Sequence, residues 1–485
     1  MKTLLYLLFI LINTPRLFAQ TTNSVEMPIV NGADFVYLGE SNEFFYYASI
    51  VTPGDDKIKV SIQKFNSSTL ELLETKDVFP RDFVPKEYVY HVNSCKVKVV
   101  YKNSKFYFFF TLAKGRNQVL FVKTLDVAFS NEKNLKIGGI DEKIDGNGDS
   151  FQILFSNDDS KALVILQKEY LRATKAFGVN VPKEFYQHSE LFGYDLINDE
   201  VLFVKPIPEE LQELKLKSDY YQIDNEGNVI FLIKLAEATD EYNKLRQLLV
   251  GYFKIEESIL ETKELDISGM QNFYGRIMYL KNDDFMFVAQ SGEDLRLSYI
   301  SISDPAKNFD KSINCFSNGI KEQKEIHLGE TVVTEKNIYF TFSDFRDNIS
   351  ALCISIDGNV QWGITIPLVR RLYEYRAYNE SIGTSSAFIN GNLHILCVEN
   401  KPYEITPKIQ KELDQDIRGI VYDLKKFETV LFTIDQKGDV EQRKINDKED
   451  YYINPIYSDF ISSHNSLMMV TKRYKKTFFL KKMDL

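Results

Sequence analysis

Cysteine is scarce in this chain of 485 residues, which contains four: Cys95, Cys315, Cys353 and Cys397. No two of them form a C-x-x-C pair, so their spacing argues against a structural zinc site and against a disulfide scaffold. Cys353 and Cys397 lie inside apolar runs. We therefore predict buried thiols there, and one disulfide bridge is the alternative.

Motifs of catalysis and of cofactor binding are also missing. The five histidines form no H-x-x-x-H or H-E-x-x-H pair, and no G-x-S-x-G segment is present. A zinc hydrolase and a nucleophile elbow are therefore not expected. The sequence predicts no catalytic residue and no cofactor.

One segment has part of a metal-binding motif. Asp145, Asn147 and Asp149 place oxygen side chains at alternate positions, as calcium loops do. An EF-hand loop would also need Gly at position 150 and Glu at position 156. Ser150 and Ser156 occupy those positions, so a polar connection is the preferred interpretation and a calcium site is the alternative.

Long hydrophobic runs are absent, since no stretch reaches the ~18 apolar residues of a membrane-spanning helix. The apolar run Leu4–Ile12 follows Lys2 and precedes Leu17-Phe18-Ala19, which is the pattern of a signal peptide. We predict a signal peptide over 1–19, one domain over 20–485, and export to the periplasm or cell surface or secretion. No Cys follows the run, so a lipid anchor is not expected. The net charge of −10 disfavours binding to nucleic acid.

Aromatic residues, in contrast, are plentiful at 13%, with 36 Phe and 28 Tyr, and they favour β-strands. The segment Lys105–Asp126 contains two apolar runs, Phe106–Leu112 and Val119–Leu125, on either side of a polar turn. This pattern predicts a β-hairpin. Similar hairpins recur roughly every 50–75 residues, which is the range of propeller blades.

The strand-like runs form eight sets. The seventh set is Ser385–Ile389, Leu393–Val398, Gly419–Leu424 and Val430–Ile434, with an extra run at Asp439–Ile445. The eighth set has only three runs, Asp459–Ser462, Leu467–Thr471 and Thr477–Met483, while a spare run, Ser24–Asn31, stands at the N-terminal end. A blade built from both ends would close the ring and remove its exposed edges. We predict an all-β fold: a single propeller of eight four-stranded blades, with seven blades as the alternative.

Four inserts interrupt the pattern: Tyr170–His188, Pro208–Ser218, Arg370–Tyr378 and Pro402–Asp416. Inserts in a ring of sheets project from its faces, where binding residues usually lie. One insert combines basic and aromatic side chains, namely Arg370, Arg371, Tyr373, Tyr375 and Tyr378. A solvated connection is the simpler interpretation of this loop, and contact with a partner is the functional one.

The only tryptophan, Trp362, ends the segment SIDGNVQW, which begins at Ser355 and contains an Asp-Gly turn. A Trp in this place usually packs between neighbouring blades. The alternative is a stacking platform for a sugar or another flat ligand, formed together with the tyrosines of 373–378.

The segment 357–367, with D-G-x-x-x-W leading into a strand that ends in Ile-Pro, resembles repeats of secreted bacterial propellers. It also loosely resembles the repeat of quinoprotein propellers. The whole mature chain resembles exported β-propeller proteins of Bacteroidetes-type bacteria. That resemblance implies a ring-shaped periplasmic or surface protein, often an accessory or binding subunit, and it transfers no site residue. A C-terminal sorting domain is not expected, because the last predicted strand ends the chain, and this favours the periplasm.

These observations predict a non-catalytic interaction or accessory subunit of the cell envelope. Its expected partner is an envelope protein, such as an outer-membrane protein of a secretion translocon. The chain itself is not expected to span the membrane. The alternatives are a propeller that binds glycans or small ligands and, with less support, a propeller hydrolase or lyase.

Overall fold

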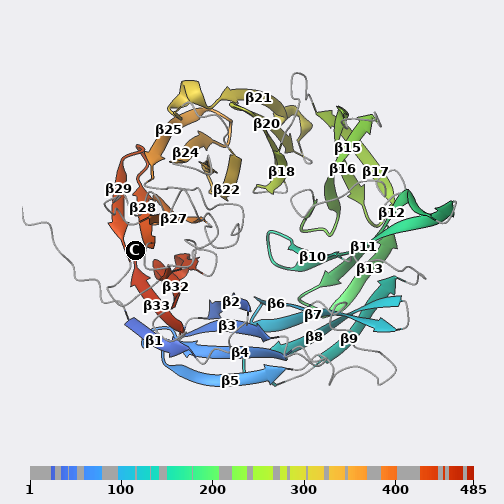
Figure 1. Cartoon of the computed structure of the whole chain (residues 1–485), viewed down its shortest axis with the longest axis horizontal. Coiled ribbons are helices and arrows are strands. Elements are labelled where there is room, and N and C mark those ends of the chain that lie inside the picture. The colour runs from blue at the N-terminus through green and yellow to red at the C-terminus, as the bar shows by residue number, and fades with distance from the viewer. Residues whose placement is uncertain are drawn as a thin grey trace, which may run out of the picture.

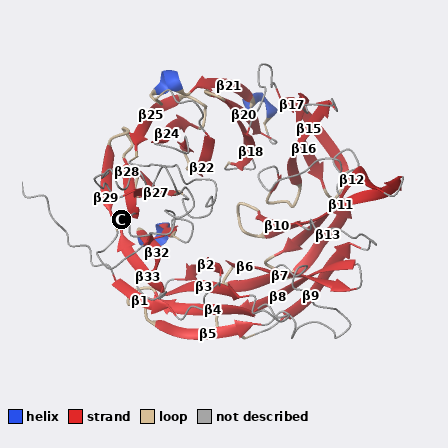
Figure 2. Cartoon of the chain, viewed as in Figure 1, coloured by secondary structure: helices blue, strands red, loops and turns tan. Residues whose placement is uncertain are grey.

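The computed structural model shows a closed ring of eight β-sheets (Figures 1 and 2). The residues that it describes are mostly in strands, and their helices are short 3-10 turns. The structure describes residues 23–27, 34–41, 43–51, 59–78, 97–114, 117–130, 133–140, 150–176, 179–206, 221–237, 244–265, 274–280, 284–301, 304–321, 327–343, 348–368, 384–400, 427–445, 452–453, 458–472 and 478–485. Within these ranges no helix is long and apolar enough to span a membrane.

Seven sheets each contain four strands that are consecutive in the chain, and we number these blades 1 to 7 in chain order. Blade 1 comprises β2 (Asp34–Ser41), β3 (Phe44–Val51), β4 (Lys59–Asn66) and β5 (Leu72–Val78), and blade 2 comprises β6 (Val97–Lys102), β7 (Lys105–Lys114), β8 (Asn117–Asp126) and β9 (Lys133–Ile140). Blade 3 comprises β10 (Ser150–Phe155), β11 (Lys161–Ala176), β12 (Val179–Asp195) and β13 (Glu200–Pro206), and blade 4 comprises β14 (Tyr221–Ile223), β15 (Val229–Glu237), β16 (Lys244–Lys254) and β17 (Ile259–Leu265). Blade 5 comprises β18 (Tyr274–Tyr279), β19 (Asp284–Ser291), β20 (Asp294–Ser301) and β21 (Phe309–Asn314), and blade 6 comprises β22 (His327–Val333), β23 (Asn337–Ser343), β24 (Asn348–Ser355) and β25 (Val360–Pro367). Blade 7 comprises β26 (Ser385–Ile389), β27 (Asn392–Asn400), β28 (Phe427–Ile434) and β29 (Val440–Lys444). Blade 8 comprises β30 (Tyr452–Ile453), β31 (Asp459–Ile461), β32 (Ser466–Lys472), β33 (Phe478–Asp484) and β1 (Asn23–Met27). The 3-10 turns are η4 (Pro305–Lys307), η5 (Phe316–Asn318) and η10 (Ser462–His464).

The ring closes as the sequence predicts. Strand β1 pairs antiparallel with β33, from Asn23 opposite Lys482 to Met27 opposite Phe478, so both ends of the chain build blade 8 (Figure 1). Eight blades are confirmed, and the alternative of seven is wrong.

Each seam between adjacent blades contains one cluster of buried apolar side chains. Phe106, Phe108 and Phe110 pack against blade 1, whereas Tyr107 and Phe109 pack against blade 3. Successive side chains of a strand point to opposite faces, and here both faces are buried. This is why the second strand of blade 2 is a continuous aromatic run rather than an alternation of apolar and polar residues.

Two sequence predictions need correction in their details. In blade 7 the third strand is β28 and the fourth is β29, so Val430–Ile434 was placed one strand too far out and Asp439–Ile445 is not an extra strand. The predicted third strand, Gly419–Leu424, lies outside the described residues. The pattern of apolar residues marks strands but does not say which of them pair.

The second correction concerns Tyr170–His188, which is not an irregular insert. Strands β11 and β12 stay paired as far as Ala176 opposite Val179, and they project beyond the rim of the ring (Figure 1). Their neighbours β10 and β13 pair only as far as Gln167 and Glu190. Within the described residues, the outer part of this hairpin, which we call the arm, is therefore formed by pairing between two strands alone. Its sequence mixes charged and apolar residues and contains Pro182, so it lacks the alternating pattern of a strand.

The two faces of the ring differ in their connections. Strands within a blade run antiparallel, so the turns between first and second strands and between third and fourth strands lie on one face, the turn face. A tight turn of this kind is Asn390-Gly391, with φ of 52° and 80°, and Asn-Gly is the preferred dipeptide for it. The other connections join strand ends on the opposite face, the loop face. The arm belongs to the loop face, and the described strand ends that flank the other three predicted inserts also lie on this face.

Blades 5 and 6 approach so closely at one point that only glycine fits. A Cβ atom on Gly363 would lie 2.0 Å from the carbonyl oxygen of Asn318, and one on Gly319 would lie 2.2 Å from that of Gly363. We expect Gly363→Ala to lower the free energy of unfolding by about 2–3 kcal/mol, because a backbone carbonyl cannot rotate away from the added methyl group.

The matched control is Gly292→Ala, where an added Cβ meets nothing within 4 Å and only the φ of 58° opposes the change. That strain should cost about 1 kcal/mol. Urea unfolding of both variants checks the expectation, and equal midpoints would show that the seam between blades 5 and 6 adapts to the extra atom.

Candidate functional site

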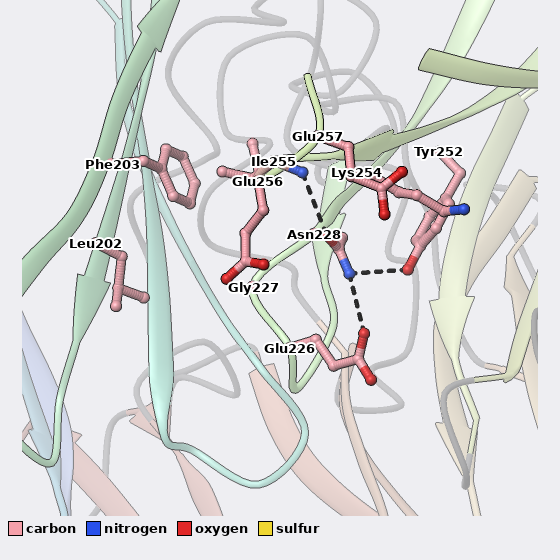
Figure 3. A pocket seen from close by; sticks show the side chains of 10 residues that line it. All are labelled: Leu202, Phe203, Glu226, Gly227, Asn228, Tyr252, Lys254, Ile255, Glu256 and Glu257. Atoms are coloured by element: carbon pink, nitrogen blue, oxygen red, sulfur yellow. Dashed lines mark hydrogen bonds between the residues drawn. The ribbon is translucent and has the colours of Figure 1, made fainter. Parts of the chain in front are cut away.

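A cavity of about 520 Å³ lies at the seam between blades 3 and 4, near the turn face (Figure 3). Blade 3 contributes two side chains from its outermost strand, β13. Blade 4 contributes its first turn and the end of its third strand with the turn that follows. The lining residues are Leu202, Phe203, Glu226, Gly227, Asn228, Tyr252, Lys254, Ile255, Glu256 and Glu257.

The apolar wall of the cavity depends on a β-bulge in blade 3. Phe203 pairs with Gly193 and Val201 pairs with Tyr194, which leaves Leu202 as the extra residue of β13. A bulge interrupts the alternation of side chains, so two consecutive residues reach one space. Gly193 makes room for the wall, because a Cβ atom there would lie 2.1 Å from the Phe203 ring.

The floor of the cavity is a saturated hydrogen-bond network around the buried carboxylate of Asp224. Its Oδ1 accepts the backbone N–H groups of Glu226 (2.9 Å) and Asn228 (2.7 Å). Its Oδ2 accepts Asn228 Nδ2 (3.0 Å) and the hydroxyl of Tyr252 (2.9 Å). Asn228 Oδ1 in turn accepts the N–H of Ile255 (3.2 Å), as Figure 3 shows. A buried network with every member satisfied is rigid, so this floor holds both turns of blade 4 in place.

Tyr252 is the one titratable hydroxyl of the cavity. Burial, followed by the adjacent Asp224 carboxylate, raises the pKa of this phenol above its ordinary value of 10. The phenol therefore stays neutral and donates to Asp224. It has neither the lowered pKa nor the free proton acceptor that acid–base or nucleophilic chemistry would need.

The mouth of the cavity is acidic. Glu226, Glu256 and Glu257 are exposed, and none of them forms an ion pair with a described residue. The ammonium of Lys254 is bound to Glu261 at 2.7 Å, outside the cavity, and this bond and the nearby Glu257 raise its pKa. Figure 3 shows the Lys254 ammonium on the side away from Leu202 and Phe203.

Two further ammonium groups near the mouth are already engaged. Lys205 donates to the Ile255 carbonyl (2.5 Å) and to the Ser258 hydroxyl (2.6 Å), and Lys161 donates to the Asn225 carbonyl. Among the described residues, no three His, Cys, Asp or Glu side chains are arranged to hold a metal ion. The cavity thus offers carboxylates beside an apolar wall, which suits binding of an organic cation.

A second polar cluster joins the innermost strands of blades 5, 6 and 7. The Ser386 hydroxyl donates to Glu330 Oε2 at 2.7 Å, and Arg276 donates to the Thr331 hydroxyl at 3.4 Å. Burial raises the pKa of the Glu330 carboxyl, while the Ser386 hydrogen bonds and the charge of Arg276 act in the opposite direction. Because each contact crosses from one blade to the next, the cluster connects blades around the centre of the ring.

Trp362 packs between two neighbouring blades, which was the simpler of its two interpretations. It belongs to β25, the outermost strand of blade 6, and its Nε1 donates to the carbonyl of Gln436 in blade 7 at 3.1 Å. Its ring also packs near Tyr339, with 6.0 Å between ring centroids. Glycan stacking on Trp362 stays a prediction.

The same kind of contact recurs at other seams, with lysine in place of tryptophan. In each case a side chain from an outer strand of one blade donates to a backbone carbonyl in the outer turn of the next. The pairs are Lys133 with Asp199, Lys205 with Ile255, Lys311 with Asp357, and Lys482 with Ser67. The sequence analysis missed this device, because a single lysine in a polar strand carries no local signal.

The other predicted site residues fall outside the described residues. These are the basic-aromatic group Arg370, Arg371, Tyr373, Tyr375 and Tyr378, and the oxygen group Asp145, Asn147 and Asp149. Their roles in partner contact and calcium binding stay predictions.

Three cysteines are described, Cys315, Cys353 and Cys397, and all are free and buried. This confirms the prediction of buried thiols for Cys353 and Cys397. Burial raises the pKa of Cys315 to about 12 and that of Cys353 to about 11. Both therefore remain protonated and unreactive at neutral pH.

Comparison with known proteins gives little beyond the architecture. No protein-family model matches the chain, and no curated protein matches it in sequence. Among solved structures it is similar to the β-propeller domain of the Trilobed protease from Pyrococcus furiosus, with 11% identity, TM-score 0.40, and coverage of 86% of this chain and 97% of that one. It is also similar to the acylaminoacyl peptidase of Pyrococcus horikoshii, with 11% identity, TM-score 0.41, and coverage of 91% and 57% respectively. A third is the polysaccharide lyase Uly1, with 10% identity, TM-score 0.36, and coverage of 81% and 90%. Likenesses this distant assign no activity to this chain, and the propeller rests on its own sheet order.

Proposed function

We propose that the protein is a non-catalytic interaction subunit of the bacterial cell envelope. Export is proposed from the apolar run at Leu4–Ile12, and the envelope setting from the resemblance of the mature chain to exported propellers. The observation that carries an interaction role is the arm of blade 3, which projects from an otherwise closed ring (Figure 1).

The arm is the longest described stretch of the ring in which two strands pair only with each other. From Lys168 opposite His188 to Ala176 opposite Val179, neither strand has a neighbour in its own sheet among the described residues. Within this part of the chain, both edges of the arm present backbone N–H and C=O groups that no further strand pairs with. An exposed edge of this kind is a template for an added strand from another protein.

The rest of the ring suits a rigid support. Eight apolar clusters fill the eight seams, and β1 closes the circle. An extended element on a stiff base keeps its binding geometry and loses little conformational entropy on docking. The partner that we propose is an envelope protein, such as an outer-membrane protein, in the periplasm or at the cell surface.

Removal of the arm should abolish docking without unfolding the ring. We expect a variant in which Asn-Gly replaces residues 169–187 to recover at least about tenfold less envelope protein from detergent-solubilised envelopes, because that dipeptide forms a short hairpin turn with no projecting edges. Pull-down with tagged mature protein and mass spectrometry measures the recovery. The melting temperature should stay unchanged, since the arm projects beyond the rim of the ring (Figure 1).

The matched control replaces only residues 177–178 by Asn-Gly, which changes the tip and keeps the length of the arm. Stoichiometric recovery of one partner by this control, together with its loss in the trimmed variant, would support the proposal. Equal recovery by both variants would contradict a role for the arm. Recovery of the protein alone, with turnover of a substrate in an activity screen, would favour an enzyme.

A further inference from the structure

We propose that the cavity between blades 3 and 4 recognises a basic peptide segment. A Lys or Arg side chain would enter beside Glu256, with Glu226 at the mouth, and an adjacent aliphatic or aromatic side chain would pack on Leu202 and Phe203. This site lies near the turn face and does not involve the arm, so it is independent of the docking role proposed above.

The apolar wall of the cavity is partly open to solvent. Leu202 is 39% exposed, and the adjacent Phe203 is half-buried. Apolar surface of this kind marks contact sites when polar groups rim it.

The carboxylates of the cavity favour a positively charged ligand. The carboxylate of Glu256 extends into the space that faces Leu202 and Phe203, whereas that of Glu226 lies on the side of Asn228, whose Nδ2 donates to it at 3.4 Å (Figure 3). The ammonium groups of Lys254, Lys205 and Lys161 are held by Glu261 and by oxygens of the adjoining turns, so none of them neutralises these two acids at hydrogen-bond distance. A desolvated pair between carboxylate and ammonium or guanidinium is stronger than one in open solvent, and the apolar wall supplies that desolvation.

The shape of the site favours a peptide over other cations. A bare metal ion would need converging oxygen ligands, and the described residues contain no such group of three acids or histidines. A small amine could satisfy the acids but would leave Leu202 and Phe203 uncovered. A polypeptide supplies both a charge and an apolar neighbour along one strand of chain, and the saturated Asp224 network keeps the receiving groups fixed.

The test uses the purified mature protein and a fluorescein-labelled nonapeptide with Leu-Arg-Phe at its centre and Gly and Ser elsewhere. We expect binding in fluorescence anisotropy that weakens as the salt concentration rises. The double variant Glu226→Gln, Glu256→Gln should bind at least about tenfold more weakly, because both acceptors of the cation lose their charge. A peptide with Glu in place of Arg should not bind.

The matched control removes the same charge from exposed glutamates outside the cavity, as Glu74→Gln with Glu264→Gln, and should bind as the unchanged protein does. Phe203→Ala tests the apolar wall, and Phe203→Leu keeps most of its packing in case the alanine variant unfolds. Equal binding by the double variant and its control would overturn the proposal, and so would binding of the Glu peptide or no binding of any peptide. The arm-trimmed protein should keep its affinity for the peptide, which separates failure of this site from failure of the docking role.

Discussion

A mature chain that lacks residues 20–27 is expected to unfold at a markedly lower temperature than one that retains them. Strand β1 covers the edge of β33 with five paired residues. Its Met27 is buried and packs in the cluster that joins blade 8 to blade 1. Loss of that side chain alone should cost about 2–4 kcal/mol, and loss of the strand should cost more, because the ring also opens.

Molecules with the opened ring should also associate with one another. Without β1 the edge of β33 presents unpaired backbone groups, which invite pairing with a second molecule. Calorimetry gives the loss of stability, and light scattering over a range of protein concentrations gives the association. Met27→Ala isolates the packing contribution, and Glu26→Ala, at an exposed position of the same strand, is its control. A truncated chain that melts like the full mature chain would contradict closure by β1.

Replacement of Asp459 by Asn is expected to stabilise the protein at neutral and basic pH and to leave it unchanged at low pH. Asp459 lies on β31 beside Tyr37 and Tyr47 of blade 1, and burial raises its pKa to about 7. Its ordinary value of 3.8 applies in the unfolded chain. Between these values the folded protein holds a proton that the unfolded chain has released, so the free energy of unfolding falls as the pH rises.

The loss is complete above about pH 7 and amounts to at most about 4 kcal/mol, since each pKa unit corresponds to about 1.4 kcal/mol. Asp459→Asn removes the ionisation and should therefore raise the melting temperature at pH 8 but not at pH 4. Asp435→Asn is the control, and its effect on stability should have the opposite sign. Backbone N–H groups in its turn lower the pKa of Asp435 and so favour its charged form. A gain in stability for Asp459→Asn that does not vary with pH would contradict ionisation as its cause.

The sequence determined the architecture, because blades are specified by local patterns. A strand buried on both faces must be apolar throughout, as Phe106–Leu112 is, and its hairpin turn must be polar. Two complementary defects, a missing strand at one end of the pattern and a spare strand at the other, were enough to predict closure. The structure confirms this closure in the pairing of β1 with β33.

Only the tertiary structure decided the arm and the cavity. The sequence of the arm mixes charged and apolar residues and contains Pro182, so no local pattern distinguishes it from a loop. The cavity unites Phe203 of blade 3 with Glu226 and Glu256 of blade 4, and the sequence gives no reason for these three to meet. Local periodicity records whether a residue is buried, whereas the residue that it faces depends on the pairing register, the bulge at Leu202 and the angle between neighbouring blades.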